Sequence, residues 1–170
     1  MKETIKWLMV AILAFGGLTN GYAQEEEEEE EEVLPVGTMA PDFILEDIDG
    51  QPLSLESLRG KYLILDFWGS WCGWCIKGIP EMKRYYQKYK SKMEILGMDC
   101  NDSKRKWKRA IEEYELPWKH VYVPKGSDVC DDYLISGFPT KIIISPEGKV
   151  MDTVVGEDPK FYEMLDKLFK

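Results

Sequence analysis

The chain has 170 residues and a formal net charge of −9, which suggests a single folded domain once any processed segment is set aside. Removing the first 23 residues takes away two lysines and one glutamate and leaves −10, and setting aside the eight consecutive glutamates 25–32 leaves −2. This nearly neutral remainder lacks the basic charge typical of nucleic-acid-binding domains, so we expect no DNA or RNA partner.

The first 23 residues have the pattern of a secretory signal peptide. A short, positively charged start precedes an apolar stretch, and Gly21 and Ala23 lie at the small-residue positions of a cleavage site. The stretch is too short and too interrupted by glycine to favour a spanning helix, although an uncleaved anchor is an alternative. We expect an exported, periplasmic protein with an acidic, solvated leader at 24–34 and its folded domain at 35–170.

The folded domain is predicted to begin with a hairpin. Residues 40–60 contain a short apolar run, the turn dipeptide Asp49-Gly50 and a brief amphipathic piece. Residues 61–68 form a continuous apolar run of strand length, which indicates a strand buried on both faces. From Cys72 the pattern changes to a helical period, and the stripe that should pack on a sheet comprises Cys75, Ile79, Met82, Tyr86 and Tyr89.

The second half continues the alternation of strands and helices. Strands are predicted at 93–100 and 119–123, with a helix over 103–116 between them that Ser103 caps. A further helix opens in 129–135, two strands joined by a turn occupy 140–156, and a closing helix at 158–169 has Asp158 as its cap and Pro159 at its first position. This order predicts a three-layer α/β fold with a central mixed sheet flanked by helices.

Cys72 and Cys75 stand three positions apart where a predicted strand gives way to a helix. They could form a structural disulfide, half of a zinc site or a redox pair. A structural disulfide rarely closes so small a loop, because it removes little entropy from the unfolded chain. Cys100 and Cys130 would complete a four-cysteine zinc site, but they are isolated in the sequence, so we expect no metal.

The predicted position of Cys72 favours the redox pair. In the first turn of a helix, free backbone N–H groups and the helix dipole stabilise a thiolate. Cys75 lies one turn further along and within disulfide reach. We therefore predict that Cys72 is exposed and nucleophilic, whereas Cys75 is shielded and resolves a mixed disulfide.

With these motifs, the chain resembles the exported thioredoxin-like reductases of the TlpA/ResA type from residue 39 to the C-terminus. Residues 65–75, "LDFWGSWCGWC", are similar to the active-site stretch of thioredoxins. Residues 40–68 match the N-terminal hairpin-and-helix extension that TlpA-type chains share with peroxiredoxin-type (AhpC/TSA) chains. Residues 107–123 match the inserted helix and strand that distinguish the TlpA-like branch.

The resemblance assigns roles to further residues. Asp66 matches the buried aspartate beneath the cysteine pair, where a desolvated carboxylate can take the proton of Cys75; an ordinary core aspartate is the alternative. Pro139, in "GFPT", matches the cis-proline loop that exposes backbone to a substrate peptide, whereas composition alone favours a trans turn. Phe138 would then lie beside the sulfurs.

Other residues near the pair leave parts of this interpretation open. Trp71 and Trp74 are expected to rim the site and contact substrate. Proline more often precedes the second cysteine in such reductases, so Trp74 leaves the direction of electron flow undecided. Cys100 and Cys130 form either a second disulfide or two buried thiols.

The resemblance implies a cofactor-free thiol–disulfide oxidoreductase. Its most direct form is a reductase of protein disulfides that is re-reduced by a membrane thiol donor. A disulfide isomerase or oxidase is the alternative within the class, and a redox-inactive module that binds a metal or a partner is the alternative outside it. The peroxidatic motif Pro-x-x-x-Thr/Ser-x-x-Cys is absent around Cys72, which argues against a peroxiredoxin.

Overall fold

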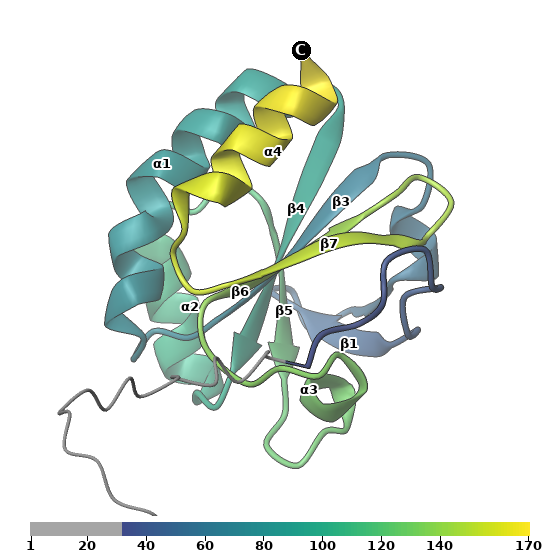
Figure 1. Cartoon of the computed structure of the whole chain (residues 1–170). Coiled ribbons are helices and arrows are strands. Elements are labelled where there is room, and N and C mark those ends of the chain that lie inside the picture. The colour runs from purple at the N-terminus through teal and green to yellow at the C-terminus, as the bar shows by residue number, and fades with distance from the viewer. Residues whose placement is uncertain (1–31) are drawn as a thin grey trace, which may run out of the picture. The chain divides into compact units, whose positions relative to one another are not determined.

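A single mixed sheet organises residues 32–170, the part of the chain that the computed structural model describes (Figure 1). Its strand order is β2-β1-β5-β4-β3-β6-β7. The strands are β1 (Ile44–Asp47), β2 (Pro52–Ser54), β3 (Tyr62–Trp68), β4 (Met93–Cys100), β5 (Lys119–Val123), β6 (Thr140–Ile144) and β7 (Val150–Val155). The helices are η1 (Glu56–Leu58), α1 (Gly73–Tyr89), α2 (Lys104–Glu113), α3 (Val129–Asp132) and α4 (Pro159–Phe169).

The pairing of the strands confirms the predicted mixed sheet. β3, β4 and β5 pair in parallel, whereas the β1–β2 hairpin and the β6–β7 hairpin extend the two sides in antiparallel pairs. The inserted α2 and β5 place β5 between β4 and the N-terminal hairpin. The predicted signal peptide at 1–23 and most of the leader at 24–34 lie outside the described residues.

Helices cover both faces of the sheet, as the sequence predicted. One core contains side chains of α1, α2 and α4, among them Met82, Trp107 and Phe161. Figure 1 shows α1 and α4 side by side on this face. The core on the opposite face includes Leu55, Val129 and side chains of the N-terminal segment. The central strands are consequently buried on both sides.

Local capping and packing mostly follow the sequence. The side chains of Ser103 and Asp158 accept hydrogen bonds from backbone N–H groups in the first turns of α2 and α4. The predicted inner stripe of α1 packs on the sheet side as expected, and Tyr86 is half-buried there, with its hydroxyl donating to Glu94 of β4. Tyr85 turns toward α4 and packs on Tyr162, with ring centroids 4.9 Å apart.

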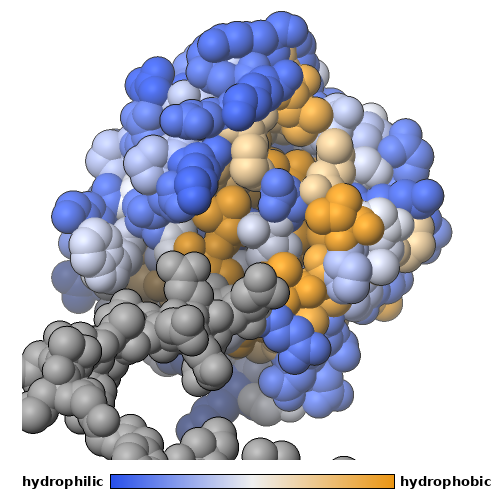
Figure 2. Space-filling view, viewed as in Figure 1, coloured by the Kyte–Doolittle hydropathy of each residue, from blue (hydrophilic) through white to orange (hydrophobic). Residues whose placement is uncertain are grey.

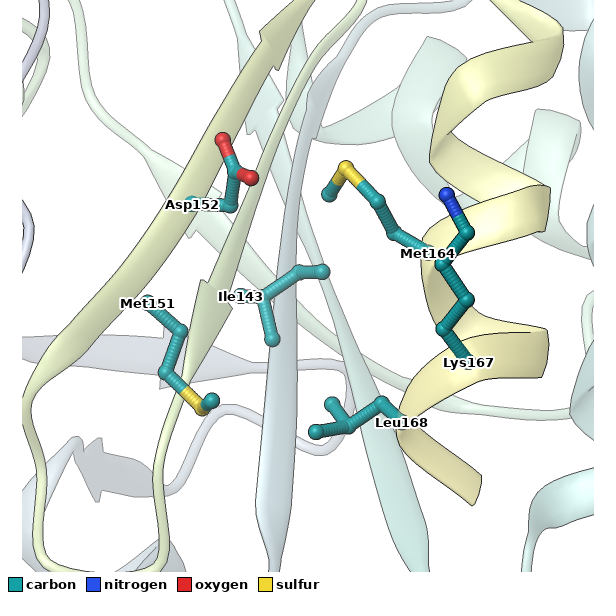
Figure 3. Close-up of a pocket in the computed structure, with 6 residues that line it drawn as sticks. All are labelled: Ile143, Met151, Asp152, Met164, Lys167 and Leu168. Atoms are coloured by element: carbon teal, nitrogen blue, oxygen red, sulfur yellow. The ribbon is translucent and has the colours of Figure 1, made fainter. Parts of the chain in front are cut away.

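An apolar pocket lies at the surface between α4 and β7 (Figure 2). It has a volume of about 240 Å³, and Figure 3 shows its lining side chains, which include Ile143, Met151, Met164 and Leu168. None of the cysteines lines this pocket.

Among the helices of residues 32–170, none is long and apolar enough to cross a membrane.

Candidate active site

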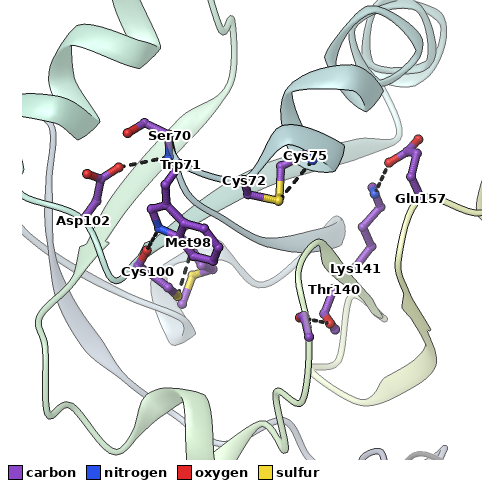
Figure 4. The surroundings of a disulfide bond; sticks show 11 residues. Ser70, Trp71, Cys72, Cys75, Met98, Cys100, Asp102, Thr140, Lys141 and Glu157 are labelled. Atoms are coloured by element: carbon purple, nitrogen blue, oxygen red, sulfur yellow. Dashed lines mark hydrogen bonds and ion pairs between the residues drawn. A yellow bond between two sulfur atoms is a disulfide. The ribbon is translucent and has the colours of Figure 1, made fainter.

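Cys72 and Cys75 form a disulfide at the start of α1 (Figure 4). Cys72 is the N-cap residue, and its Sγ accepts a hydrogen bond from the backbone N–H of Cys75 at 3.1 Å. The structure therefore corrects two predictions: Cys72 precedes the first turn, and it is buried, with 5% exposure against 7% for Cys75. In the disulfide, Cys72 belongs to the core cluster that contains Trp68 and Ile79.

Aromatic side chains form the rim of the disulfide site. Trp71 and Trp74 are 49% and 63% exposed, which is unusual for such large side chains. The indole N–H of Trp71 donates to the backbone carbonyl of Cys100 at 2.9 Å, and its ring meets that of Phe138 edge-to-face, with centroids 5.2 Å apart. The structure thus places Phe138 against Trp71, and its contact with substrate beside the sulfurs stays a prediction.

The loop that follows Phe138 also has the expected form. The peptide bond between Phe138 and Pro139 is cis. The hydroxyl of Thr140 donates to the carbonyl of Gly137 at 2.8 Å, which holds the loop closed where β6 begins. The loop and the cysteine pair therefore lie on the same side of the molecule, with Trp71 bridging them through Phe138.

Asp66 lies on β3 in the core beneath the site. Its residues i−2 and i+2, Ile64 and Trp68, belong to the same cluster as both cysteines, so its side chain shares their face of the sheet. It is 9% exposed, and Oδ1 has no hydrogen-bond partner among the described residues. Burial raises the pKa of Asp66 to about 6, and Lys141 partly offsets this effect.

Lys141 is a site residue that the sequence did not reveal. It lies directly opposite Asp66 in the antiparallel pairing of β3 and β6, and its side chain is 2% exposed. Its Nζ contacts Glu157 Oε2 at 2.7 Å (Figure 4). The hydroxyl of Tyr162 donates to Glu157 Oε1 at 2.6 Å. The buried ammonium group of Lys141 therefore serves two carboxyl groups, those of Asp66 and Glu157.

The carboxylate of Glu157 also reaches α1. A Cβ atom added to Gly78 would lie 2.3 Å from Glu157 Oε2, so this glycine leaves the space that the carboxylate fills. Gly78 is one turn beyond Cys75 on the same helix. The Lys141–Glu157 pair consequently connects the neighbourhood of Asp66 to the helix that carries both cysteines.

Asp99 is a second buried carboxyl group that the sequence reasoning missed. It lies opposite Trp68 in the pairing of β3 and β4, is fully buried, and has no hydrogen-bond partner for either oxygen among the described residues. Burial, with a contribution from Asp102, raises its pKa to about 8, so it is protonated at neutral pH. A lone aspartate in the apolar segment 93–100 was the signal available in the sequence.

Replacing Asp66 with asparagine is expected to raise the free energy of unfolding of the disulfide form at pH 7 by about 3 kcal/mol. This is the free energy that corresponds to raising the pKa of Asp66 from 3.8 in the unfolded chain to about 6 in the folded protein. The folded protein binds this proton more tightly than the unfolded chain, so ionised Asp66 destabilises the fold at neutral pH. The difference in unfolding free energy between Asp66→Asn and the wild type should shrink as the pH falls from 6 to 4. Urea unfolding at both pH values measures it, and an equal gain at pH 4 and pH 7 would contradict the assignment.

Comparisons with known proteins identify the family. The model of the AhpC/TSA family matches residues 36–153. The thiol-disulfide oxidoreductase ResA of a Bacillus cereus strain is 34% identical over 160 residues, which cover 94% of this chain and 92% of the relative. ResA of Bacillus subtilis (strain 168) is 36% identical over 126 residues, covering 74% and 70%.

A solved structure has the same fold. The thioredoxin domain of a thiol-disulfide oxidoreductase from Bacteroides vulgatus superimposes with a TM-score of 0.74 at 34% identity, and the match covers 81% of this chain and 99% of that domain. Together with the Cys72–Cys75 pair on a mixed sheet flanked by helices, these matches agree with the resemblance seen in the sequence. The chain therefore belongs to the AhpC/TSA family, as a thiol–disulfide oxidoreductase of the TlpA/ResA type with a thioredoxin-like fold.

Proposed function

We propose that this protein reduces disulfide bonds of exported proteins. In the reduced enzyme, the Cys72 thiolate attacks a substrate disulfide, releases one substrate thiolate and forms a mixed disulfide. Cys75 then attacks Cys72 Sγ and releases the second substrate thiolate, which restores the Cys72–Cys75 disulfide. The two protons that the cysteines lose pass to the two released thiolates, so one disulfide is reduced and one is formed.

The position of the disulfide is the observation that carries this proposal. Cys72 lies at the N-terminus of α1, where the backbone N–H of Cys75 already points at its sulfur. The same N–H would stabilise a Cys72 thiolate once the disulfide opens, because a hydrogen bond to the charged form lowers a pKa. The exposed Trp71 and Trp74 and the cis-Pro139 loop supply a surface beside the sulfurs for a substrate peptide.

Asp66 is proposed as the general base for Cys75. A carboxylate whose pKa is near 6 is mostly ionised at neutral pH, yet it is basic enough to accept a proton from the resolving thiol. Lys141 and Glu157 are proposed as positioning residues, since they set the electrostatic surroundings of Asp66 without lying at the sulfurs themselves.

Export and re-reduction complete the proposal. A signal peptide at residues 1–23 would deliver the protein to the periplasm, or hold it at the membrane if it stays uncleaved. Each substrate disulfide that is reduced leaves the enzyme oxidised, so continued turnover requires a thiol donor, for which we propose a membrane protein that carries electrons from the cytosol. No cofactor is needed for this exchange chemistry.

A trapping experiment tests the proposed chemistry. Reduced Cys75→Ser protein, mixed with insulin, should accumulate a covalent complex through Cys72, because no resolving thiol remains. The matched Cys72→Ser protein should accumulate none, because the backbone N–H at the start of α1 stabilises a thiolate at position 72 and not at position 75. Complexes are counted by non-reducing electrophoresis and mass spectrometry. If both variants trap insulin equally, the assignment of attacking and resolving roles is wrong. If neither variant traps insulin, the exchange chemistry itself is wrong and a binding module is favoured.

A further inference from the structure

Two thiols outside the first pair are already in contact. Cys100, the last residue of β4, is 1% exposed, and Cys130, in α3, is half-buried. Their Sγ atoms lie 3.5 Å apart although the residues are separated by 30 positions. A disulfide requires about 2.05 Å between sulfurs, so an approach of about 1.5 Å would form the bond.

The two thiols differ in access. A surface pocket of about 340 Å³ is lined by Cys130 and by residues that include Asp131, Leu134 and Ile135, so an external reagent can reach Cys130. Cys100 is not among the lining residues and lies beneath it. The hydrogen bond between the two thiols lowers the pKa of Cys130, whereas the same interaction and burial raise the pKa of Cys100. Cys130 is therefore the sulfur that ionises and reacts first.

We propose that Cys100 and Cys130 form a second, reversible dithiol–disulfide site that exchanges with external disulfides. The Cys130 thiolate attacks one sulfur of the external disulfide and releases one thiolate, and the Cys100 sulfur then attacks Cys130 Sγ and releases the other. The two protons lost by the cysteines pass through solvent to the released thiolates. Two cysteines are oxidised and one external disulfide is reduced to two thiols.

This second site adjoins the rim of the first. The backbone carbonyl of Cys100 accepts the indole N–H of Trp71 at 2.9 Å. The backbone carbonyl of Cys130 accepts the N–H of Ile135 at 2.9 Å, in the segment that leads to Phe138, and Phe138 packs on Trp71. A Cys100–Cys130 bond would tie together the two segments that hold Trp71 and Phe138, so oxidation is expected to change the surroundings of Trp71.

The test uses the full chain with Cys72→Ser and Cys75→Ser, so its result does not depend on the proposed reductase activity. The protein is equilibrated with oxidised glutathione or with insulin, quenched in acid, unfolded and alkylated, and its thiols are counted by mass spectrometry. We expect both thiols to disappear together without a bound glutathione and to return with dithiothreitol. If oxidised glutathione closes the bond and insulin does not, the site is supported and its oxidants are small disulfides.

Other outcomes would overturn the proposal. Two thiols that stay free with both oxidants, or a lasting glutathione adduct on Cys130, would show that Cys100 does not close the bond. The matched Cys130→Ala version of the same chain should leave Cys100 unmodified. If the cysteine-to-serine variant does not fold, disulfide mapping of proteolytic peptides from the wild-type protein gives the same decision, because a Cys100–Cys130 peptide is either present or absent.

A fluorescence measurement tests the contact with the rim. In the same variant, closing the second disulfide should shift the tryptophan emission, and Trp71→Phe should remove most of that shift. An unchanged shift in Trp71→Phe would show that the bond forms without reaching the rim of the first site, which would contradict this part of the proposal.

Discussion

Replacing Cys72 with serine in protein that also carries Cys130→Ala is expected to lower the rate of insulin-disulfide reduction by about a thousandfold or more relative to Cys130→Ala alone, with dithiothreitol as the electron donor. The hydroxyl of serine does not form a mixed disulfide, and Cys75 lacks the N-cap position at which a backbone N–H stabilises a thiolate. The loss should appear in kcat/KM, because the first covalent step is removed. The assay follows insulin precipitation against the uncatalysed dithiothreitol rate.

The control for this result is Cys130→Ala, which removes a cysteine outside the Cys72–Cys75 pair. It should keep most of the activity in the presence of dithiothreitol, because both proposed reacting sulfurs remain and dithiothreitol keeps Cys100 reduced. A protein with Cys72→Ser and Cys130→Ala that retained more than about a tenth of the Cys130→Ala rate would contradict the role of Cys72 as the attacking sulfur.

Replacing Lys141 with methionine is expected to destabilise the fold by about 3 kcal/mol or more at pH 7, because it leaves buried carboxyl groups without their cation. The side chain of Lys141 is 2% exposed, and that of Glu157 is 17% exposed, so solvent screens the pair only weakly. Loss of the cation should also raise the pKa of Asp66 further, since the charge of Lys141 lowers that pKa in the native protein.

Two measurements check this second expectation. Urea unfolding gives the change in stability, and the double variant Lys141→Met with Glu157→Gln should recover much of it, because the stranded carboxylate is removed as well. The pKa of Asp66 can be followed by its carboxyl carbon signal in nuclear magnetic resonance. A Lys141→Met protein with wild-type stability and an unchanged Asp66 titration would show that the ion pair is unimportant.

Much of the fold follows from periodicity in the sequence. The apolar run at 61–68 and the alternation of strands and helices after it were sufficient to predict the mixed sheet, because strands buried on both faces read as continuous apolar segments. The caps Ser103 and Asp158 were predictable because they depend on neighbours within a few positions. The Cys72–Cys75 pair was also recognisable, because the spacing of the two cysteines at the start of a helix is a local pattern.

What the sequence missed depends on contacts between distant segments. Lys141 sits in the segment "TKIII", whose apolar neighbours indicate only a buried strand. Its role emerges from the register that sets it opposite Asp66 and from Glu157 in the turn before α4. The burial of Cys72 likewise results from the tertiary packing around the disulfide, which a local pattern does not contain.

The equilibrium reduction potential of the Cys72–Cys75 pair tests the proposed direction of electron flow most directly. It should be measured in full-length protein with Cys100 and Cys130 replaced by serine and alanine, so that only one couple titrates against a glutathione or dithiothreitol buffer. A reductase is expected to have a potential of about −270 mV or lower. A value of about −120 mV would contradict the proposal and make the protein an oxidant of thiols.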